Sequence, residues 1–217
     1  MEVVMNQEKV TLDIPFSEKL KGIPGFFGIR LGEEPFYEVV CTEGDKEIRK
    51  YNSFILASVT INGNFEEAKK EAFACLASYI FGQNKDHKHL KMTSPVLQEE
   101  TNDYIPMTSP IYQEPNSNGW TMSFVLPQKY NLATAPTPKD NRILLHKSPE
   151  RMVASLRYSG VNDQEKIKKF SAELVQWISK SDLFFPVGDI QIAQYDGPTT
   201  IPFLRRNEVH VEVKQFF

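Results

Sequence analysis

The segment 65–81 sets aromatic, small and cationic side chains at helical spacing, so it predicts an amphipathic helix. Lys70, Phe73, Ala74, Ala77 and Phe81 fall at i, i+3, i+4, i+7 and i+11, on adjoining parts of one face. The two alanines would let a flat ring system approach the helix backbone, and the two phenylalanines would stack on the ring or meet its edge. Lys70 would meet a carboxylate on the ring while its stem covers apolar surface.

The same spacing also fits an ordinary core stripe in which Lys70 simply faces solvent, since core-facing helices repeat with the same period. The pattern leaves both interpretations open.

Composition excludes several classes of protein. The chain has 217 residues, 41% hydrophobic and 24% charged, close to the averages for a soluble globular protein. Its net charge of -3 argues against nucleic acid as a partner, because phosphate binding needs clustered Lys and Arg. We expect no membrane partner, because no run reaches the roughly 18 apolar residues that a span needs. The N-terminus lacks the basic and apolar regions of a signal peptide.

The two cysteines, Cys41 in an expected strand and Cys75 in the expected helix, cannot make a disulfide framework. We expect both to be free, buried thiols in a reducing compartment. The predicted location is therefore cytoplasmic.

The elements fall into two similar series. Residues 1–35 carry turn formers and predict an N-terminal arm, and 36–40 and 47–51 predict a hairpin. A strand over 54–61 leads to the first helix, with Asn64 as its N-cap and Gly82 just beyond its end. Strands are predicted at 90–96, 105–111 and 120–126. A second helix over 163–179 and strands at 189–195 and 207–213 follow.

An offset of 97 residues relates the two series. It matches Ala57-Ser58 with Ala154-Ser155, Gly63 with Gly160 and Phe73 with Phe170. We therefore predict an α+β fold for a single domain over 36–217, in which duplicated strand–helix–strand halves form a curved antiparallel sheet or open barrel with two helices packed on it.

Six blocks in the right order resemble the SOUL family of haem-binding proteins, over about residues 36–213. They are Tyr37-Glu38-Val39-Val40, Glu47-Ile48-Arg49-Lys50-Tyr51, Tyr79-Ile80-Phe81-Gly82-Gln83-Asn84, Met92-Thr93-Ser94-Pro95-Val96 with its near copy Met107-Thr108-Ser109-Pro110-Ile111, Tyr195-Asp196-Gly197-Pro198, and Arg205-Arg206-Asn207-Glu208-Val209.

This resemblance implies non-covalent binding of haem or a related tetrapyrrole in an open hydrophobic groove, without enzymatic turnover. The groove would lie between the first helix and the loop before the last strand. From that loop we expect contributions from Tyr195, Pro198, Ile201, Phe203 and Arg205.

The loop departs from the family pattern. Family members carry a basic residue early in it, where this chain has Thr199, Thr200 and Ile201. Arg205 and Arg206 remain as partners for a propionate, and because neighbouring strand residues point to opposite faces, at most one faces the ligand. The alternative for both is an ion pair with Glu208 or a neighbouring strand.

We expect no strong axial ligand for haem iron. His87 and His89 lie in a charged loop, His146 lies on a strand, and His210 alternates with valines on a face expected to be exposed. Some family members carry a histidine at the position of Lys50. The predicted binding is thus mainly hydrophobic, with no metal site made by protein side chains.

No Gly-x-Gly-x-x-Gly, P-loop, His-Glu-x-x-His, Cys-x-x-Cys or Gly-x-Ser-x-Gly motif is present, so we expect no catalytic residues. The leading hypothesis is a haem or tetrapyrrole carrier, buffer or sensor. Two alternatives stay open: a GyrI-like binder of hydrophobic small molecules, and an interaction module whose groove receives a helix or peptide of a partner protein.

Overall fold

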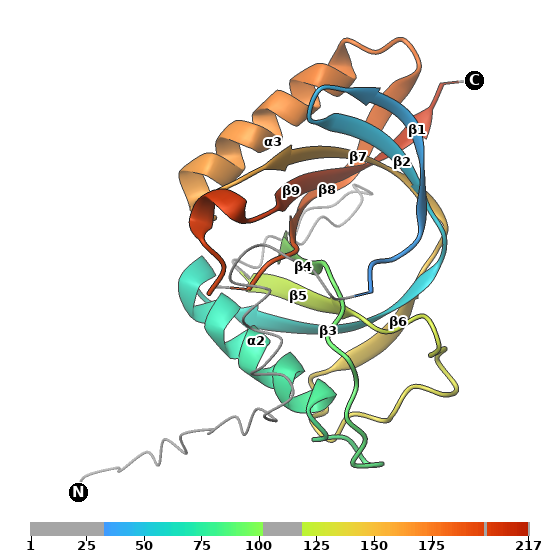
Figure 1. Ribbon diagram of the computed structural model, residues 1–217, viewed down its shortest axis with the longest axis vertical. Coiled ribbons are helices and arrows are strands. Elements are labelled where there is room, and N and C mark those ends of the chain that lie inside the picture. The colour runs from blue at the N-terminus through green and yellow to red at the C-terminus, as the bar shows by residue number, and fades with distance from the viewer. Residues whose placement is uncertain (1–32, 102–118, 198, 217) are drawn as a thin grey trace, which may run out of the picture.

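One antiparallel sheet of nine strands organises the computed structural model, which describes residues 33–101, 119–197 and 199–216. The sheet curves into an open barrel, and both helices lie on its outer face (Figure 1). The predicted α+β fold is confirmed. The elements are β1 (Tyr37–Glu43), β2 (Lys46–Tyr51), β3 (Phe54–Asn62), α2 (Phe65–Ile80), β4 (Val96–Thr101), β5 (Gly119–Val125), β6 (Leu144–Ser148), β7 (Arg151–Tyr158), α3 (Gln164–Ser179), β8 (Phe184–Gln194), the 3₁₀ helix η1 (Pro202–Leu204) and β9 (Asn207–Gln215).

The strand order shows the duplication. The sheet runs β1-β2-β7-β9-β8-β4-β5-β3-β6, so β7-β9-β8 mirrors β3-β5-β4 across the central β8–β4 pair. The strand before β3, β2, pairs with β7, and the strand before β7, β6, pairs with β3. Each half therefore contributes its leading strand to the other half, and β1 is added at one edge.

Local sequence signals set the two helices. The side chain of Asn64 accepts a hydrogen bond from the Glu67 N–H, and Asp163 does the same for Lys166, so both helices begin at a capping residue. Gly82 follows α2 with φ 101°, a left-handed conformation that glycine adopts without strain.

The strands predicted between the two helices differ in part from those that the structure shows. Residues 90–95 are not a strand; β4 begins only at Val96, since Pro95 has no N–H for a ladder and the Ser94 N–H is bonded to the Glu33 carbonyl. The strand predicted over 105–111 and the arm over 1–32 lie outside the described residues.

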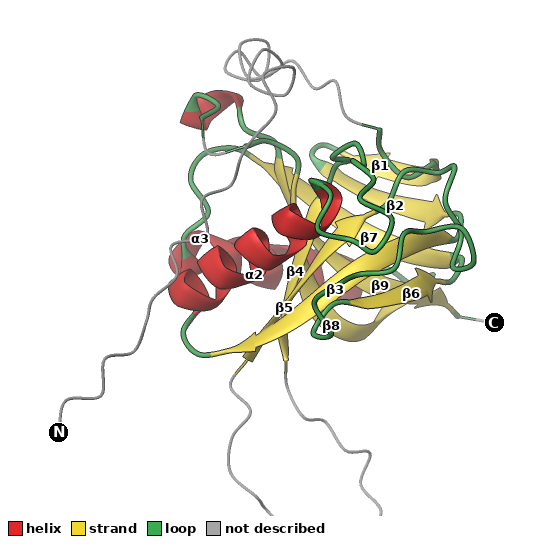
Figure 2. Ribbon diagram, turned by 90° about the horizontal axis from the view of Figure 1, so that it is seen from below, coloured by secondary structure: helices red, strands yellow, loops and turns green. Residues whose placement is uncertain are grey.

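The core has an outer and an inner part. Outside the sheet, α2 buries Ala68, Ala72 and Leu76 against β3 and β5, and α3 buries Leu174 and Ile178 against β7, β8 and β9. Figure 2 shows both helices against the same side of the curved sheet. A third cluster fills part of the interior with Leu56, Leu97, Val125, Ala193 and Tyr195.

Cys41 is exposed, so its predicted burial was wrong. The residue lies on β1, an edge strand that pairs only with β2, and every residue of β1 after Tyr37 is exposed, although Trp177 of α3 donates a hydrogen bond to Glu43 at its end. Cys75 is buried in α2 as predicted, and both thiols are free.

The two thiols should react very differently. Burial and the hydrogen bond to Asp140 raise the pKa of Cys75 to about 11, which suppresses its thiolate, whereas Cys41 is open to reagent. We expect one thiol per chain to react with a disulfide reagent at pH 7.5 in the folded protein and two in denaturant. Cys41→Ser should abolish the fast reaction; a fast reaction that persists in this variant would contradict the assignment, as would a Cys41–Cys75 bridge in non-reducing mass spectrometry.

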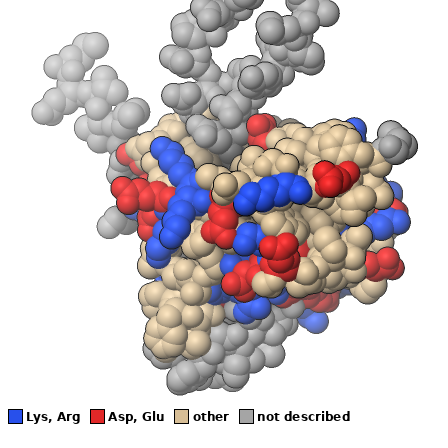
Figure 3. Space-filling model, turned by 90° about the horizontal axis from the view of Figure 1, so that it is seen from above, with Lys and Arg blue, Asp and Glu red and all other residues tan. Residues whose placement is uncertain are grey.

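Surface charge is mixed. On the face seen in Figure 3, Lys and Arg side chains are interspersed with Asp and Glu. In the part of the chain that the structure describes, neither helix is long and apolar enough to cross a membrane.

Candidate functional site

The predicted ligand-binding stripe on α2 is open at its first turns and covered near its end. Lys70 is exposed, and Phe73 is 37% exposed with its ring set edge-on against Phe124 at 5.6 Å between centroids. Ala77 is completely buried and Phe81 packs partly against the core. The core stripe, one of the two alternatives, thus describes the end of the helix, whereas Lys70 and Phe73 in its first turns are accessible to solvent.

Ala74 lines a cavity of about 550 Å³ that the sequence did not predict. Its helix wall includes Cys75, Ser78 and Tyr79, and its other wall is the charged segment 139–143 before β6. In that segment Arg142 bonds both Asp140 and Glu71, and its bonds hold the pKa of Asp140 well below the usual range.

The loop before β9 presents residues of two kinds. Phe203, on η1, is 73% exposed, and Ile201 is half-buried. Arg205 donates from Nε to the Thr200 carbonyl at 2.8 Å. Tyr195 is buried inside the barrel, where its hydroxyl donates to Glu208. Pro198 lies outside the described residues.

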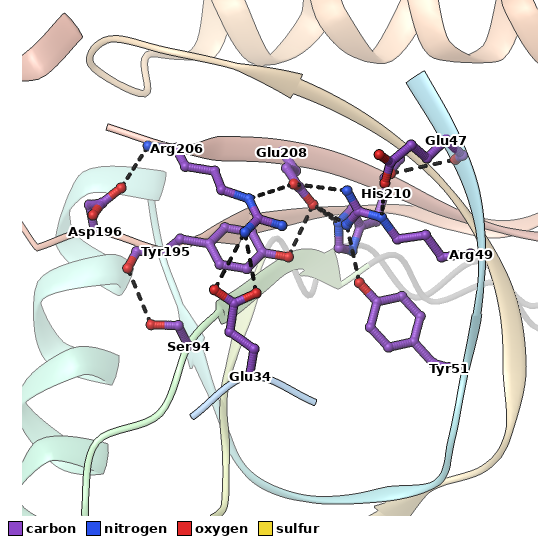
Figure 4. A network of polar contacts seen from close by, with 11 residues as sticks. Glu34, Glu47, Arg49, Tyr51, Ser94, Tyr195, Asp196, Arg206, Glu208 and His210 are labelled. Atoms are coloured by element: carbon purple, nitrogen blue, oxygen red, sulfur yellow. Dashed lines mark hydrogen bonds and ion pairs between the residues drawn. The ribbon is translucent and has the colours of Figure 1, made fainter. Parts of the chain in front are cut away.

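Inside the barrel, polar side chains from β2, from β9 and from the two ends of the loop between β8 and β9 converge on Glu208, which is completely buried (Figure 4). Its carboxylate accepts from Arg49 Nη1 at 2.6 Å and Nη2 at 3.1 Å, and from Arg206 Nε at 2.8 Å. The Tyr195 hydroxyl at 3.0 Å and His210 Nε2 at 2.7 Å complete its partners. We call these five residues the Glu208 cluster.

Charges in the Glu208 cluster are balanced by carboxylates at its edges. Glu47 accepts from Arg49 Nε at 2.6 Å, and Glu34 lies 3.2 Å from Arg206 Nη1. Burial alone would raise the pKa of Glu208, but the hydrogen bond from His210 and the bonds and charge of Arg49 hold it well below its usual range.

Burial lowers the pKa of His210, and this outweighs the opposing effect of Glu208. With two guanidinium groups already on the carboxylate, a neutral imidazole that donates from Nε2 satisfies the cluster.

The exposed position expected for His210 was wrong, since the residue is only 4% exposed. Both faces of β9 are covered: Val209, Val211 and Val213 pack toward α3, while Glu208 and His210 belong to the cluster inside the barrel. The bond to Glu208 also occupies His210 Nε2, which is therefore not available to an iron atom.

Arg206 fixes both ends of the loop before β9. Its guanidinium lies over the Tyr195 ring, 3.8 Å from the centroid, and its backbone N–H donates to the Asp196 carboxylate at 2.7 Å. Arg206 thus makes the ion pair with Glu208 that the sequence left as its alternative, and it is not free for a propionate. Charged residues alternating within the β2 and β9 segments were the signal in the sequence for this cluster.

The open barrel with two outer helices is shared with solved structures. The C-terminal domain of EcmrR superposes with a TM-score of 0.56 at 13% identity, over 83% of this chain and 99% of that domain. A hydrolase from Listeria innocua gives 0.53 at 10% identity, over 92% and 98% of the two chains. These likenesses show a shared fold.

The sequence comparison identifies the family. A sequence profile of the SOUL heme-binding proteins matches residues 32–212, so the chain belongs to this family. Heme-binding protein 1 of Xenopus laevis is 29% identical over 169 residues, which cover 75% of this chain and 80% of that protein. Heme-binding protein 1 of Xenopus tropicalis is 27% identical with the same coverage.

Proposed function

We propose that this protein binds haem or a related tetrapyrrole non-covalently at the outer face of α2, without catalysing a reaction. One observation carries the proposal: Phe73 is held partly open to solvent against Phe124, one turn from the exposed Lys70. Under the offset of 97 residues its counterpart is Phe170, which instead stacks on Tyr158 at 4.4 Å. Only α2 therefore presents this aromatic to a ligand.

The described residues fit a flat ring with acidic substituents. Phe73 offers a ring for stacking, Lys70 a cation for a propionate, and Ala74 a small side chain at the edge of a cavity. The exposed Phe203 and the half-buried Arg205 of the loop before β9 would cover the opposite side of the ligand, together with Ile201. Ala77 and Phe81 support the helix from within, and Tyr195 holds the loop through Glu208.

Haem would supply the iron, while the chain supplies apolar burial. Within the described residues, no group of three or more His, Cys, Asp or Glu side chains could hold a metal ion. Burying ~300 Å² of apolar ligand surface contributes on the order of 7 kcal/mol before association costs, which leaves room for micromolar affinity.

The role that we favour for this binding is that of a carrier, buffer or sensor in the cytoplasm. Two alternative functions remain. The fold shared with the EcmrR C-terminal domain suits a binder of hydrophobic small molecules. The exposed Phe73 and Phe203 would equally suit a peptide partner. A titration with haemin, iron-free protoporphyrin and a drug-like cationic dye separates these functions.

We expect protoporphyrin to bind within about tenfold of haemin, a gap of ~1.4 kcal/mol, because iron adds little to ring burial. Phe73→Ser should weaken both ligands by about tenfold, since it removes an aromatic contact and apolar area. Val175→Ser on α3 is the matched control: Val175 is 39% exposed, and its replacement should change neither affinity. Absorbance titration of the full chain measures all of these.

Three outcomes would contradict the proposal. A far tighter haemin complex with a six-coordinate spectrum, lost on replacing one histidine, would reveal an axial ligand. Equal effects of Phe73→Ser and Val175→Ser would remove α2 as the binding face. Saturable binding of the dye alone would favour the small-molecule alternative. Ala77→Trp is a poor probe, because Ala77 is fully buried and a larger side chain would overpack the helix.

A further inference from the structure

The two halves of the barrel interior carry different chemistry at corresponding positions. In the second half, Ser155 pairs with His210, and Arg157 pairs with Glu208. The offset of 97 residues relates Ser155 to Ser58 and Arg157 to Thr60. In the first half, Ser58 pairs with Ser123, and Thr60 pairs with Thr121. In the first half, Ser123 therefore stands at the position of His210, and Thr121 stands at the position of Glu208.

The strands β2 and β6, which the two halves exchange, also carry different residues at corresponding positions. Arg49 on β2 pairs with Val153, whereas His146 on β6 pairs with Leu56, the residue related to Val153 by the same offset. The position of Arg49 is thus taken by His146. Where the second half has Arg49, His210 and Glu208, the first half has His146, Ser123 and Thr121.

The space left in the first half is a cavity of about 180 Å³ inside the barrel. Its polar lining comes from six strands, β3 to β8, and includes Ser58, Gln98, Ser123, His146, Arg151 and Gln191. At about 30 Å³ for each water in the liquid, it has room for roughly six waters, or one small solute. A tetrapyrrole is far too large to enter it.

The lining is rich in donors. Arg151 donates from Nη2 to Gln191 at 3.0 Å, and its Nη1 lies 3.8 Å from Glu212, but its buried Nε has no partner among the described residues. The Ser58 and Ser123 hydroxyls lie 2.6 Å apart, and one proton suffices for their bond, so a second remains to donate. A buried N–H without an acceptor is costly, which favours an acceptor in the cavity. Gln98 Oε1, a buried acceptor in the same lining, also has no partner among the described residues, so the occupant meets one opposing acceptor.

We propose that this cavity binds a small oxyanion, a carboxylate or a phosphate, which accepts from Arg151 Nε and from the serine pair. His146 pairs with Leu56 of the interior cluster and stands in the same lining, where its ring can offer a further hydrogen bond. The bound anion takes the place in the first half that the Glu208 carboxylate occupies in the second. This site is separate from the outer face of α2 and goes beyond the proposed binding of tetrapyrroles.

Calorimetric titration of the full chain with inorganic phosphate and with succinate, in chloride buffer, tests the site and separates the two anions. We expect saturable binding of at least one of them. Arg151→Gln should weaken it at least tenfold, and Ser58→Leu, which fills the cavity, should abolish it. Lys50→Gln is the matched control, because it removes a cation from the outward side of β2, where Lys50 pairs with Glu150.

The absence of saturable heat for both anions would overturn the proposal. So would equal losses in Arg151→Gln and Lys50→Gln, or binding that survives Ser58→Leu. Thermal unfolding and haemin affinity, followed in every variant, confirm that the protein is folded. If Arg151→Gln fails to fold, Ser58→Leu still decides the question. Haemin binding and anion binding can each fail without the other, so the two proposals are judged separately.

Discussion

Replacing Arg49 with leucine is expected to lower the free energy of unfolding by about 3 kcal/mol, the lower end of the cost of breaking a buried ion pair. Arg49 is 3% exposed and donates two hydrogen bonds to the completely buried Glu208. Without it, Glu208 keeps Arg206, Tyr195 and His210 but loses its shortest bond, and the carboxylate stays buried. Urea unfolding of the wild type and the variant at pH 7.5 measures the difference.

Lys50 provides the matched control. It is the next residue on β2, points away from the cluster and pairs with Glu150 at the exposed surface. Lys50→Leu should shift the urea midpoint far less than Arg49→Leu. Similar shifts would mean that the Glu208 cluster contributes no more than a surface ion pair, and that it does not hold the loop before β9 in place.

The folded protein should lose stability as the pH falls below about 6.5. Burial depresses the pKa of His210 in the fold, so below the unfolded-state value of about 6.5 the unfolded chain takes up a proton that the folded chain does not. Between pH 7 and 5.5 this one group should remove about 1 kcal/mol. Urea midpoints at pH 7, 6.2 and 5.5 follow the change.

Glu208 adds a second pH range, at lower pH, over which the folded protein loses stability. Its pKa is depressed in the fold, so its contribution is fully present above the unfolded value of about 4.3 and is lost progressively below it. We expect His210→Gln to flatten the slope between pH 7 and 5.5 and to leave the steep loss below pH 4.3. His89→Gln, at an exposed position, should keep the loss of stability in both pH ranges. An unchanged slope in His210→Gln would show that another group carries it.

The sequence by itself determined the features that depend on neighbours along the chain. Capping residues and helical periodicity placed α2 almost to the residue, periodicity alone placed α3, and the offset of 97 residues revealed two related halves. Ordered blocks from residue 36 to 213 identified the family, and the matching profile confirmed it. These signals are local, because a cap or a period acts within one or two turns.

Only the tertiary structure decided which faces are covered. Alternation along β9 suggested one buried and one exposed face, but in a curved barrel both are covered, so Glu208 and His210 lie inside. Cys41 has strand character and is nevertheless exposed, because β1 lies at the edge of the sheet with only one neighbouring strand. The exchange of β2 and β6 between the halves, which sets Arg49 beside Glu208 and leaves a cavity opposite, depends on pairings between segments about a hundred residues apart. No local pattern records such pairings, since they follow from how the whole sheet closes around its interior.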